Sequence, residues 1–232
     1  MRPGIIILVL SFFLPIVVSA QILIPVEMET NLAEQATGFY LQKFANKKEL
    51  PSGFEWQALM ALSFYPELRN THIKFRIKHT YPTAKTRPSD ISVFLPKKSR
   101  TYIITISDQS IDTLQPILMT NLPYDAQVGL MGHELGHVAD FSKKNFLQNT
   151  GNLFGHLSPS YLDKMEKNTD LIAIQHGLGK YLKAWSQYIR TTFQTKYWRG
   201  SDYVKVRNDH IERYMNPDTI EKYMQQYEGK KN

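Results

Sequence analysis

The sequence of 232 residues contains no cysteine. Without cysteine the folded chain has no disulfide bonds, so packing alone must stabilise it. Thiolate metal ligands are excluded as well, and any metal ion must be bound by histidine, aspartate or glutamate side chains. The sequence also lacks internal repeats and low-complexity tracts. Its length then favours one globular domain with one hydrophobic core.

Long apolar runs are scarce, and the only one lies at the N-terminus. Residues 5–18 are almost wholly apolar, and a positive charge precedes them at Arg2. This run is shorter than the roughly 20 residues that a bilayer-spanning helix needs. The layout is typical of a cleavable signal peptide at residues 1–20. We therefore expect an exported protein, periplasmic or secreted, whose mature chain, residues 21–232, is a single domain without a transmembrane segment.

The chain has a modest excess of positive charge. Its formal net charge is +7, which taken alone suggests an anionic partner such as nucleic acid or a membrane surface. For an exported chain, a mildly basic and solvated surface is the simpler interpretation. We expect no nucleic-acid partner.

The spacing of apolar residues changes along the chain and predicts an α+β fold. The segment HIKFRIKH, residues 72–79, alternates apolar and basic side chains as a half-exposed strand does. Residues 91–95 and 100–107 are further strand candidates. Helical spacing predicts helices at 27–44, 54–65, 124–141, 159–176, 180–195 and from Asn216 onward. We expect a small, mostly antiparallel sheet packed with these helices.

The segment GHELGH, residues 132–137, carries the residues most suited to chemistry. Positions four apart on a helix project from the same face, so His133 and His137 can both approach one ion. Glu134 points about 100° further round the helix, within reach of a water molecule on that ion. This is the H-E-x-x-H arrangement, which supplies two zinc ligands and a general base from one rigid element.

Three glycines, Gly129, Gly132 and Gly136, interrupt the same predicted helix. Each costs about 1 kcal/mol relative to alanine inside a helix. Together they leave one side of the helix without bulk. That side allows either the close approach of a substrate or backbone, or tight packing against another helix, and the sequence favours neither.

A catalytic zinc ion needs a third protein ligand and one position left for water. The longer motif with a third histidine is excluded, because Lys143 stands where that histidine would be. The next predicted helix offers Glu166 and Asp170, one turn apart among apolar neighbours, where unpaired carboxylates are costly. Spacing alone permits either carboxylate to be the ligand. His156, in the loop before this helix, is a further alternative.

Taken together, GHELGH and the later segment EKNTD, residues 166–170, resemble the motifs of gluzincin zinc metallopeptidases. Members of that group carry H-E-x-x-H followed by E-x-x-A-D, and this chain is similar to the soluble minimal core of the CAAX-processing and heat-shock metallopeptidase clan. Thr169 stands where the second motif has alanine. The membrane enzymes' transmembrane helices have no counterpart, so the resemblance is to the catalytic core.

The resemblance implies a minimal zincin-like core and a role for each of five residues. It implies that His133, His137 and Glu166 bind zinc and that Glu134 is the general base. It also implies that Asp170 supports a ligand histidine through the second ring nitrogen, which fixes the orientation of the ring.

These expectations lead to a hypothesis of zinc-dependent hydrolysis of a peptide or protein substrate. The strand candidate at 100–107 would offer an edge to an extended peptide, and His210, Tyr203 or Tyr214 would stabilise the oxyanion. Two alternatives stay open: a zinc amidase acting on a cell-envelope substrate, and a catalytically silent zincin-fold module with a binding or structural role. The presence of Glu134 beside both histidines weighs against the silent module, because metal binding does not require a base.

Overall fold

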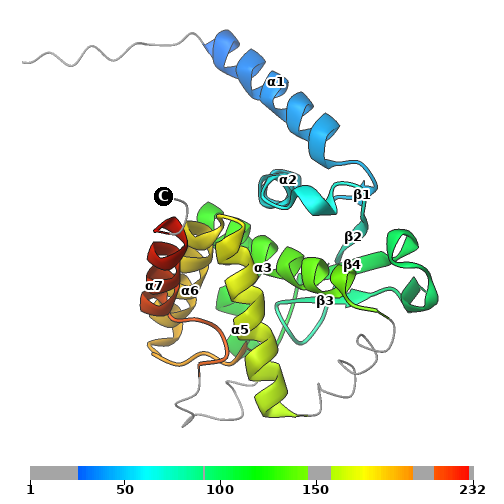
Figure 1. Ribbon diagram of the computed structural model, residues 1–232. Helices are drawn as coiled ribbons and strands as arrows, with labels where there is room; N and C mark the ends of the chain where they lie inside the picture. The colour runs from blue at the N-terminus through cyan, green and yellow to red at the C-terminus, as the bar shows by residue number, and fades with distance from the viewer. Residues whose placement is uncertain (1–25, 91, 146–157, 201–211, 230–232) are drawn as a thin grey trace, which may run out of the picture. The chain divides into compact units, whose positions relative to one another are not determined.

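The computed structural model describes residues 26–90, 92–145, 158–200 and 212–229 (Figure 1). The expected signal peptide, residues 1–20, lies outside this part of the chain. Three residues that the sequence analysis named as alternatives also lie outside it: His156, Tyr203 and His210.

The chain divides into two compact units, residues 1–35 and residues 36–232. Helix α1, Val26–Phe44, crosses this boundary. The described strands and the other described helices belong to the second unit. None of the described helices is long and apolar enough to pass through a membrane.

The described helices of the second unit follow the helical spacing in the sequence. Two of them start as their sequences suggest, because proline, whose fixed φ suits the first turn of a helix, follows Ser158 in one and Asn216 in the other. After α1 they are α2 (Glu55–Ser63), α3 (Tyr124–Lys143), α5 (Pro159–Gln175), α6 (Gly179–Phe193) and α7 (Pro217–Glu228). The helix predicted to carry GHELGH is α3.

One mixed sheet of four strands accompanies these helices, in the order β1-β2-β4-β3. The strands are β1 (Lys48–Glu49), β2 (His72–Ile77), β3 (Ala84–Pro88) and β4 (Thr101–Ile106). Strand β2 is parallel to both β1 and β4, and only the β3–β4 pair is antiparallel. The α+β class is therefore confirmed, but the prediction of a mostly antiparallel sheet is wrong. Alternation of apolar and polar residues reports which face is buried, and it carries no information on strand direction.

Two other strand predictions are corrected by the sheet. Residues 91–95 were expected to form a strand, but Ser92–Phe94 is a 3₁₀ turn. The strand that lies nearby is β3, whose sequence AKTRP is polar and ends in proline, a residue found mainly at sheet edges. Residues 100–107 were also expected to offer a free strand edge to a peptide substrate. This prediction is wrong, because β4 is paired on both sides.

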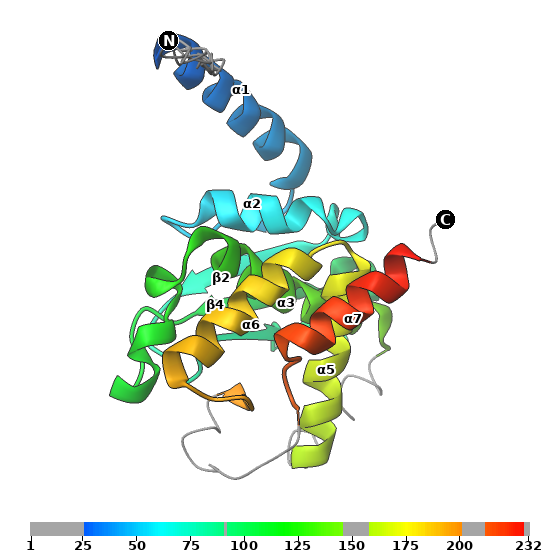
Figure 2. The same ribbon diagram turned by 90° about the vertical axis from the view of Figure 1, so that its left-hand side faces the viewer.

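Helix α3 lies at the centre of the second unit. It contacts α2, α5, α6 and strand β3, and Figure 2 shows it between α6 and the sheet. The inner face of the sheet contributes Ile73, Tyr102 and Ile104 to the core, and α3 contributes residues such as Met131 and Leu135. Every residue of α3 from Val128 to Ala139 is buried, so the polar side chains of GHELGH are held within packed surroundings.

The three glycines of α3 mark the places where other elements approach most closely. A Cβ added at Gly129 would lie 2.2 Å from the carbonyl oxygen of Tyr181 in α6, and one at Gly136 would lie 3.0 Å from Cγ2 of Thr169 in α5. At Gly132 it would lie 2.8 Å from Leu178. Of the two interpretations left open by the sequence, these contacts support tight packing of helices against α3.

Replacing Gly129 with alanine should destabilise the fold, because the added methyl group meets a backbone carbonyl that cannot move by itself. We expect the free energy of unfolding to fall by about 1–3 kcal/mol, the usual cost of overpacking. Urea unfolding followed by circular dichroism measures this change. The matched control is Gly38→Ala in α1, where an added Cβ meets nothing within 4 Å and the greater helix propensity of alanine should leave stability equal or slightly higher. Equal stabilities for wild type and Gly129→Ala would contradict the packing interpretation.

Candidate metal centre

Two histidine side chains from adjacent turns of α3 form one side of the site. His133 and His137 have exposed fractions of 1% and 6%. Their ring centroids lie 4.9 Å apart, and the ring planes are nearly perpendicular. The four-residue spacing therefore directs both imidazoles to the same side of the helix, as the sequence predicted.

Glu166 of α5 supplies a carboxylate between these two rings. Its Oε2 atom lies 3.0 Å from Nε2 of His133 and 3.2 Å from Nε2 of His137. One potential ligand atom from each of the three residues lies within 4.8 Å of the others. His133, His137 and Glu166, named here the metal group, could hold a metal ion.

Asp170, one turn after Glu166, lies behind His133. Its Oδ1 atom lies 2.8 Å from Nδ1 of His133, and its Oδ2 atom accepts a hydrogen bond of 2.7 Å from the backbone N–H of Met215. The two carboxylates that the sequence left equivalent thus occupy different places. Glu166 faces the Nε2 atoms of both histidines, and Asp170 faces the opposite nitrogen of one of them.

The contacts between these groups shift the pKa values of His133 and Glu166. A carboxylate can only accept a hydrogen bond, so Nδ1 of His133 carries the hydrogen directed to Asp170. Burial alone lowers the pKa of His133, but its hydrogen bonds to Asp170 and Glu166 outweigh burial and raise this pKa to about 10. Burial likewise raises the pKa of Glu166, but the nearby His137 and His133 outweigh it and hold this pKa well below the usual value.

Glu134, the predicted base, is buried beside the metal group and held by the edge strand. The hydroxyl of Thr86 in β3 donates a hydrogen bond of 2.7 Å to Oε2 of Glu134. Both residues line the same cleft as the metal group. Sequence reasoning missed Thr86, because a single threonine in a short polar strand carries no motif.

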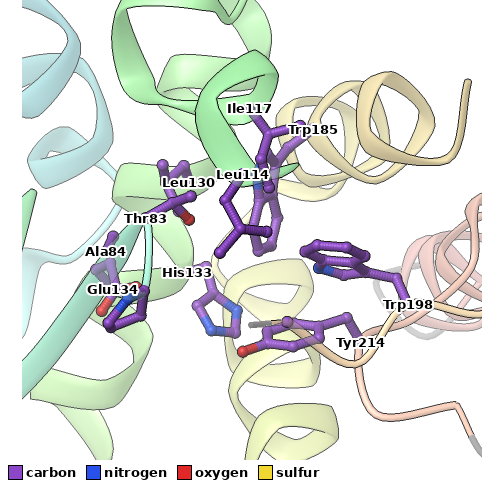
Figure 3. A pocket seen from close by; sticks show the side chains of 12 residues that line it. Thr83, Ala84, Leu114, Ile117, Leu130, His133, Glu134, Trp185, Trp198 and Tyr214 are labelled. Carbon is purple, nitrogen blue, oxygen red and sulfur yellow. The ribbon is translucent and has the colours of Figure 1, made fainter. Parts of the chain in front are cut away.

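Of the three oxyanion donors suggested by the sequence, Tyr214 is the one that lies among the described residues. Its ring lies beside that of His133, with centroids 5.5 Å apart (Figure 3). Burial raises the pKa of its hydroxyl well above the usual value, and the nearby carboxylates of Glu166 and Glu134 raise it further. The hydroxyl therefore keeps its proton at neutral pH and can donate a hydrogen bond.

The position of Tyr214 is set through its backbone and its ring. Arg190 of α6 donates a hydrogen bond of 2.9 Å to the carbonyl oxygen of Tyr214. Gly200 packs against the ring, where an added Cβ would lie 3.1 Å from the tyrosine hydroxyl, and its positive φ of 65° also favours glycine. These contacts place an aromatic hydroxyl in the wall of the cleft.

The metal group opens into a cleft of about 760 Å³, a volume that includes open space at its mouth. One wall is strand β3, with Ala84, Lys85 and Thr86, and another is α5, with Leu162 and Met165. A smaller hollow adjoins His133 and Glu134, and apolar side chains line it together with these two polar groups (Figure 3). The apolar side chains are Leu114, Ile117, Leu130, Trp185 and Trp198.

A buried ion pair attaches the C-terminal segment to α5 beside this cleft. Asp163 accepts hydrogen bonds from Arg199 and Arg213, with the shortest distances 2.8 Å and 2.7 Å. Burial raises the pKa of Asp163, but the two guanidinium groups outweigh it and lower this pKa. Because Arg213 precedes Tyr214, the ion pair also restrains the segment that carries the tyrosine.

Comparison of the chain with protein-family models, with curated proteins and with solved structures finds no match. Function must therefore be inferred from the residues of this chain and their geometry. Of the predicted site residues, the structure groups His133, His137 and Glu166, and it places Glu134 and Asp170 around them.

Two substitutions on α5 separate the roles of its carboxylates. Glu166→Gln removes the charged ligand atom, so metal content should fall to a small fraction of the wild-type value. Asp170→Asn alters only the partner of His133, so the site should still fill at saturating metal, with affinity lower by about 10- to 100-fold. Metal analysis after dialysis, together with a chelator competition titration, measures both quantities.

The opposite pattern, an empty site in Asp170→Asn and a filled one in Glu166→Gln, would exchange the two roles. Unchanged metal affinity in both variants would place the third ligand elsewhere. Glu228→Gln, an exposed position in α7, serves as the control for a glutamate-to-glutamine change and should bind metal as the wild type does.

Proposed function

We propose that the protein is an exported zinc-dependent metallopeptidase of the gluzincin type. One observation carries the proposal: the metal group, Glu134 and Tyr214 line the same cleft. A protein that only bound a metal would need the three ligands, but neither a buried carboxylate next to them nor a tyrosine in the wall of the same cleft.

The choice of zinc follows from the chemistry of the donor atoms. Two imidazole nitrogens and one carboxylate oxygen match the His₂Glu set of catalytic zinc sites, which leaves one position for water or substrate. Calcium and magnesium prefer sets made only of oxygen atoms. The positions of Glu166 within the group and of Asp170 behind His133 also agree with the arrangement that the E-x-x-A-D motif implies.

Within this proposal three residues of the cleft have distinct roles beside the metal ion. Zinc, when bound, supplies polarisation of the scissile carbonyl and lowers the pKa of a water molecule towards 7. Glu134 accepts the proton of the attacking water and passes it to the leaving amine. Thr86 keeps the Glu134 carboxylate in place, and Tyr214 donates a hydrogen bond to the negative charge that develops on the carbonyl oxygen.

Strand β3 is the part of the cleft suited to an extended peptide. Among the described residues β3 pairs only with β4, so its other edge can accept a substrate strand through backbone hydrogen bonds. Alternate residues of β3 differ in exposure, with Lys85 and Arg87 exposed and Thr86 half-buried over Glu134. A peptide along this edge would pass the metal group.

A zinc amidase acting on a cell-envelope substrate uses the same residues, so it differs from this proposal only in substrate. A silent zincin-fold module differs in having no turnover. The two alternatives are therefore distinguished by experiment: cleavage of unmodified peptides supports the peptidase, cleavage of cell-wall amides alone supports the amidase, and metal binding without any cleavage supports the silent module.

Glu134→Gln should abolish most activity while leaving the metal bound. The amide is similar in size to the carboxylate and cannot accept the proton, so the rate should fall by about 10²- to 10⁴-fold, the usual contribution of a general base. A peptide-library digest followed by mass spectrometry measures cleavage, and metal analysis of the same sample measures zinc. Glu228→Gln should cleave as the wild type does. Equal cleavage by Glu134→Gln and wild type would remove Glu134 from the mechanism.

Tyr214→Phe tests the oxyanion donor separately from the base. Loss of one such donor typically lowers kcat by about 10²- to 10³-fold, and zinc content should not change because the hydroxyl is not in the metal group. Tyr223→Phe in α7, a partly buried tyrosine that does not line the cleft, is the matched control. A normal kcat in Tyr214→Phe would show that the charge is stabilised by another residue.

A further inference from the structure

Thr169 occupies the position at which this chain departs from the E-x-x-A-D pattern. Its side chain is buried and lies behind His137, with Oγ1 3.1 Å from Nδ1 of that histidine. The same hydroxyl donates a hydrogen bond of 3.0 Å to the carbonyl oxygen of Met165, one turn earlier in α5. Alanine at this position would make neither contact.

The number of hydrogens on each group indicates which one donates in the contact between Thr169 and His137. A threonine hydroxyl carries one hydrogen, and a carbonyl oxygen can only accept. With its hydrogen donated to Met165, the hydroxyl oxygen of Thr169 can accept a hydrogen from Nδ1 of His137. With a hydrogen on Nδ1, Nε2 is the nitrogen that a metal ion can bind, in place of the hydrogen that it directs to Glu166 in the metal-free site.

We propose that Thr169 is a positioning residue that fixes the tautomer and the orientation of His137 for metal binding. The inference rests on the proposed metal site and adds a residue to it. Two consecutive residues of α5 then accept hydrogen bonds from the two histidines of α3. Asp170 accepts from His133 through a charged carboxylate, and Thr169 accepts from His137 through a neutral hydroxyl. Hydrogen bonds to the outer nitrogen of a ligand histidine are the usual way in which its metal-binding nitrogen is directed.

The packing around Thr169 explains why threonine suits this position. Its Cγ2 atom faces Gly136 of α3, where an added Cβ would come within 3.0 Å. The methyl group thus fills the space that the glycine leaves, and branching at Cβ limits χ1 to few rotamers. The hydroxyl is therefore held towards His137 by its own methyl group.

Two substitutions distinguish the hydroxyl from the shape of the side chain. Thr169→Val keeps the branched shape and removes the hydroxyl, and Thr169→Ser keeps the hydroxyl and removes the methyl group. Thr105→Val in the central strand β4 is the control for the same chemical change at a buried threonine that does not line the cleft. Zinc affinity is measured by chelator competition, and unfolding of the metal-free proteins is followed in urea.

We expect Thr169→Val to bind zinc about 10- to 100-fold more weakly than wild type, the usual effect of losing such a partner, with little change in the unfolding midpoint of the metal-free protein. Thr169→Ser should bind within a few-fold of wild type, and Thr105→Val should bind as wild type does. With Co²⁺ in place of zinc, the visible spectrum should change in Thr169→Val and not in Thr169→Ser. A purely structural role would shift the unfolding midpoint and leave affinity and spectrum alone.

Wild-type affinity and spectrum in Thr169→Val would overturn this inference and leave the metal site standing. Failure of the wild-type protein to bind zinc would instead overturn the proposed function. The same affinity loss in Thr169→Ser as in Thr169→Val would also overturn the inference, because the effect would then follow shape and not the hydroxyl.

Discussion

The buried carboxylate of Asp170 is the group on which the site's geometry depends most. A carboxylate this deeply buried is costly unless its oxygens are hydrogen-bonded, and its two oxygens are used by different elements: Oδ1 by His133 of α3 and Oδ2 by the N–H of Met215. Met215 follows Tyr214. The hydrogen bonds that orient one histidine of the metal group therefore also fix the chain beside the tyrosine in the cleft wall, and neither can shift without leaving the carboxylate unsatisfied.

Close packing of helices makes this arrangement possible. Gly129 lets the backbone of α6 approach α3, and Gly136, about two turns further on, lets Thr169 of α5 approach it as closely. The contacts of α5 are short because no Cβ intervenes, so Glu166 and Asp170 reach the histidines directly. The helix-propensity cost of these glycines, about 1 kcal/mol each, is the consequence of building a polar site on a helix that is packed on nearly every side.

Parts of the site follow from local periodicity, and these were predictable. GHELGH places two imidazoles on one helix face whatever the surrounding fold, and the four-residue step from Glu166 to Asp170 keeps both near that face. Which of the two carboxylates meets the metal depends on how α5 packs on α3, so spacing left both open. Strand direction, the edge position of β3 and the contact of Thr86 with Glu134 depend on tertiary pairing, which the sequence pattern does not record. Of the fold, only the general α+β class could be predicted, from the order in which helical and alternating spacing of apolar residues occurs along the chain.

The residues of the site fall into two sets, and different helices and strands hold each set in place. The metal group and the partners of its histidines come from α3 and α5 alone, so a protein could keep its metal with these two helices intact. The proposed base and the proposed hydroxyl donor depend on other parts: Thr86 of β3 holds Glu134, and Arg190 of α6 holds the backbone of Tyr214. A chain selected only to bind a metal has no need of the second set, and a strand hydroxyl directed to a buried carboxylate adds nothing to metal affinity. The presence of both sets around one cleft is the physical reason to favour hydrolysis over a silent metal-binding role.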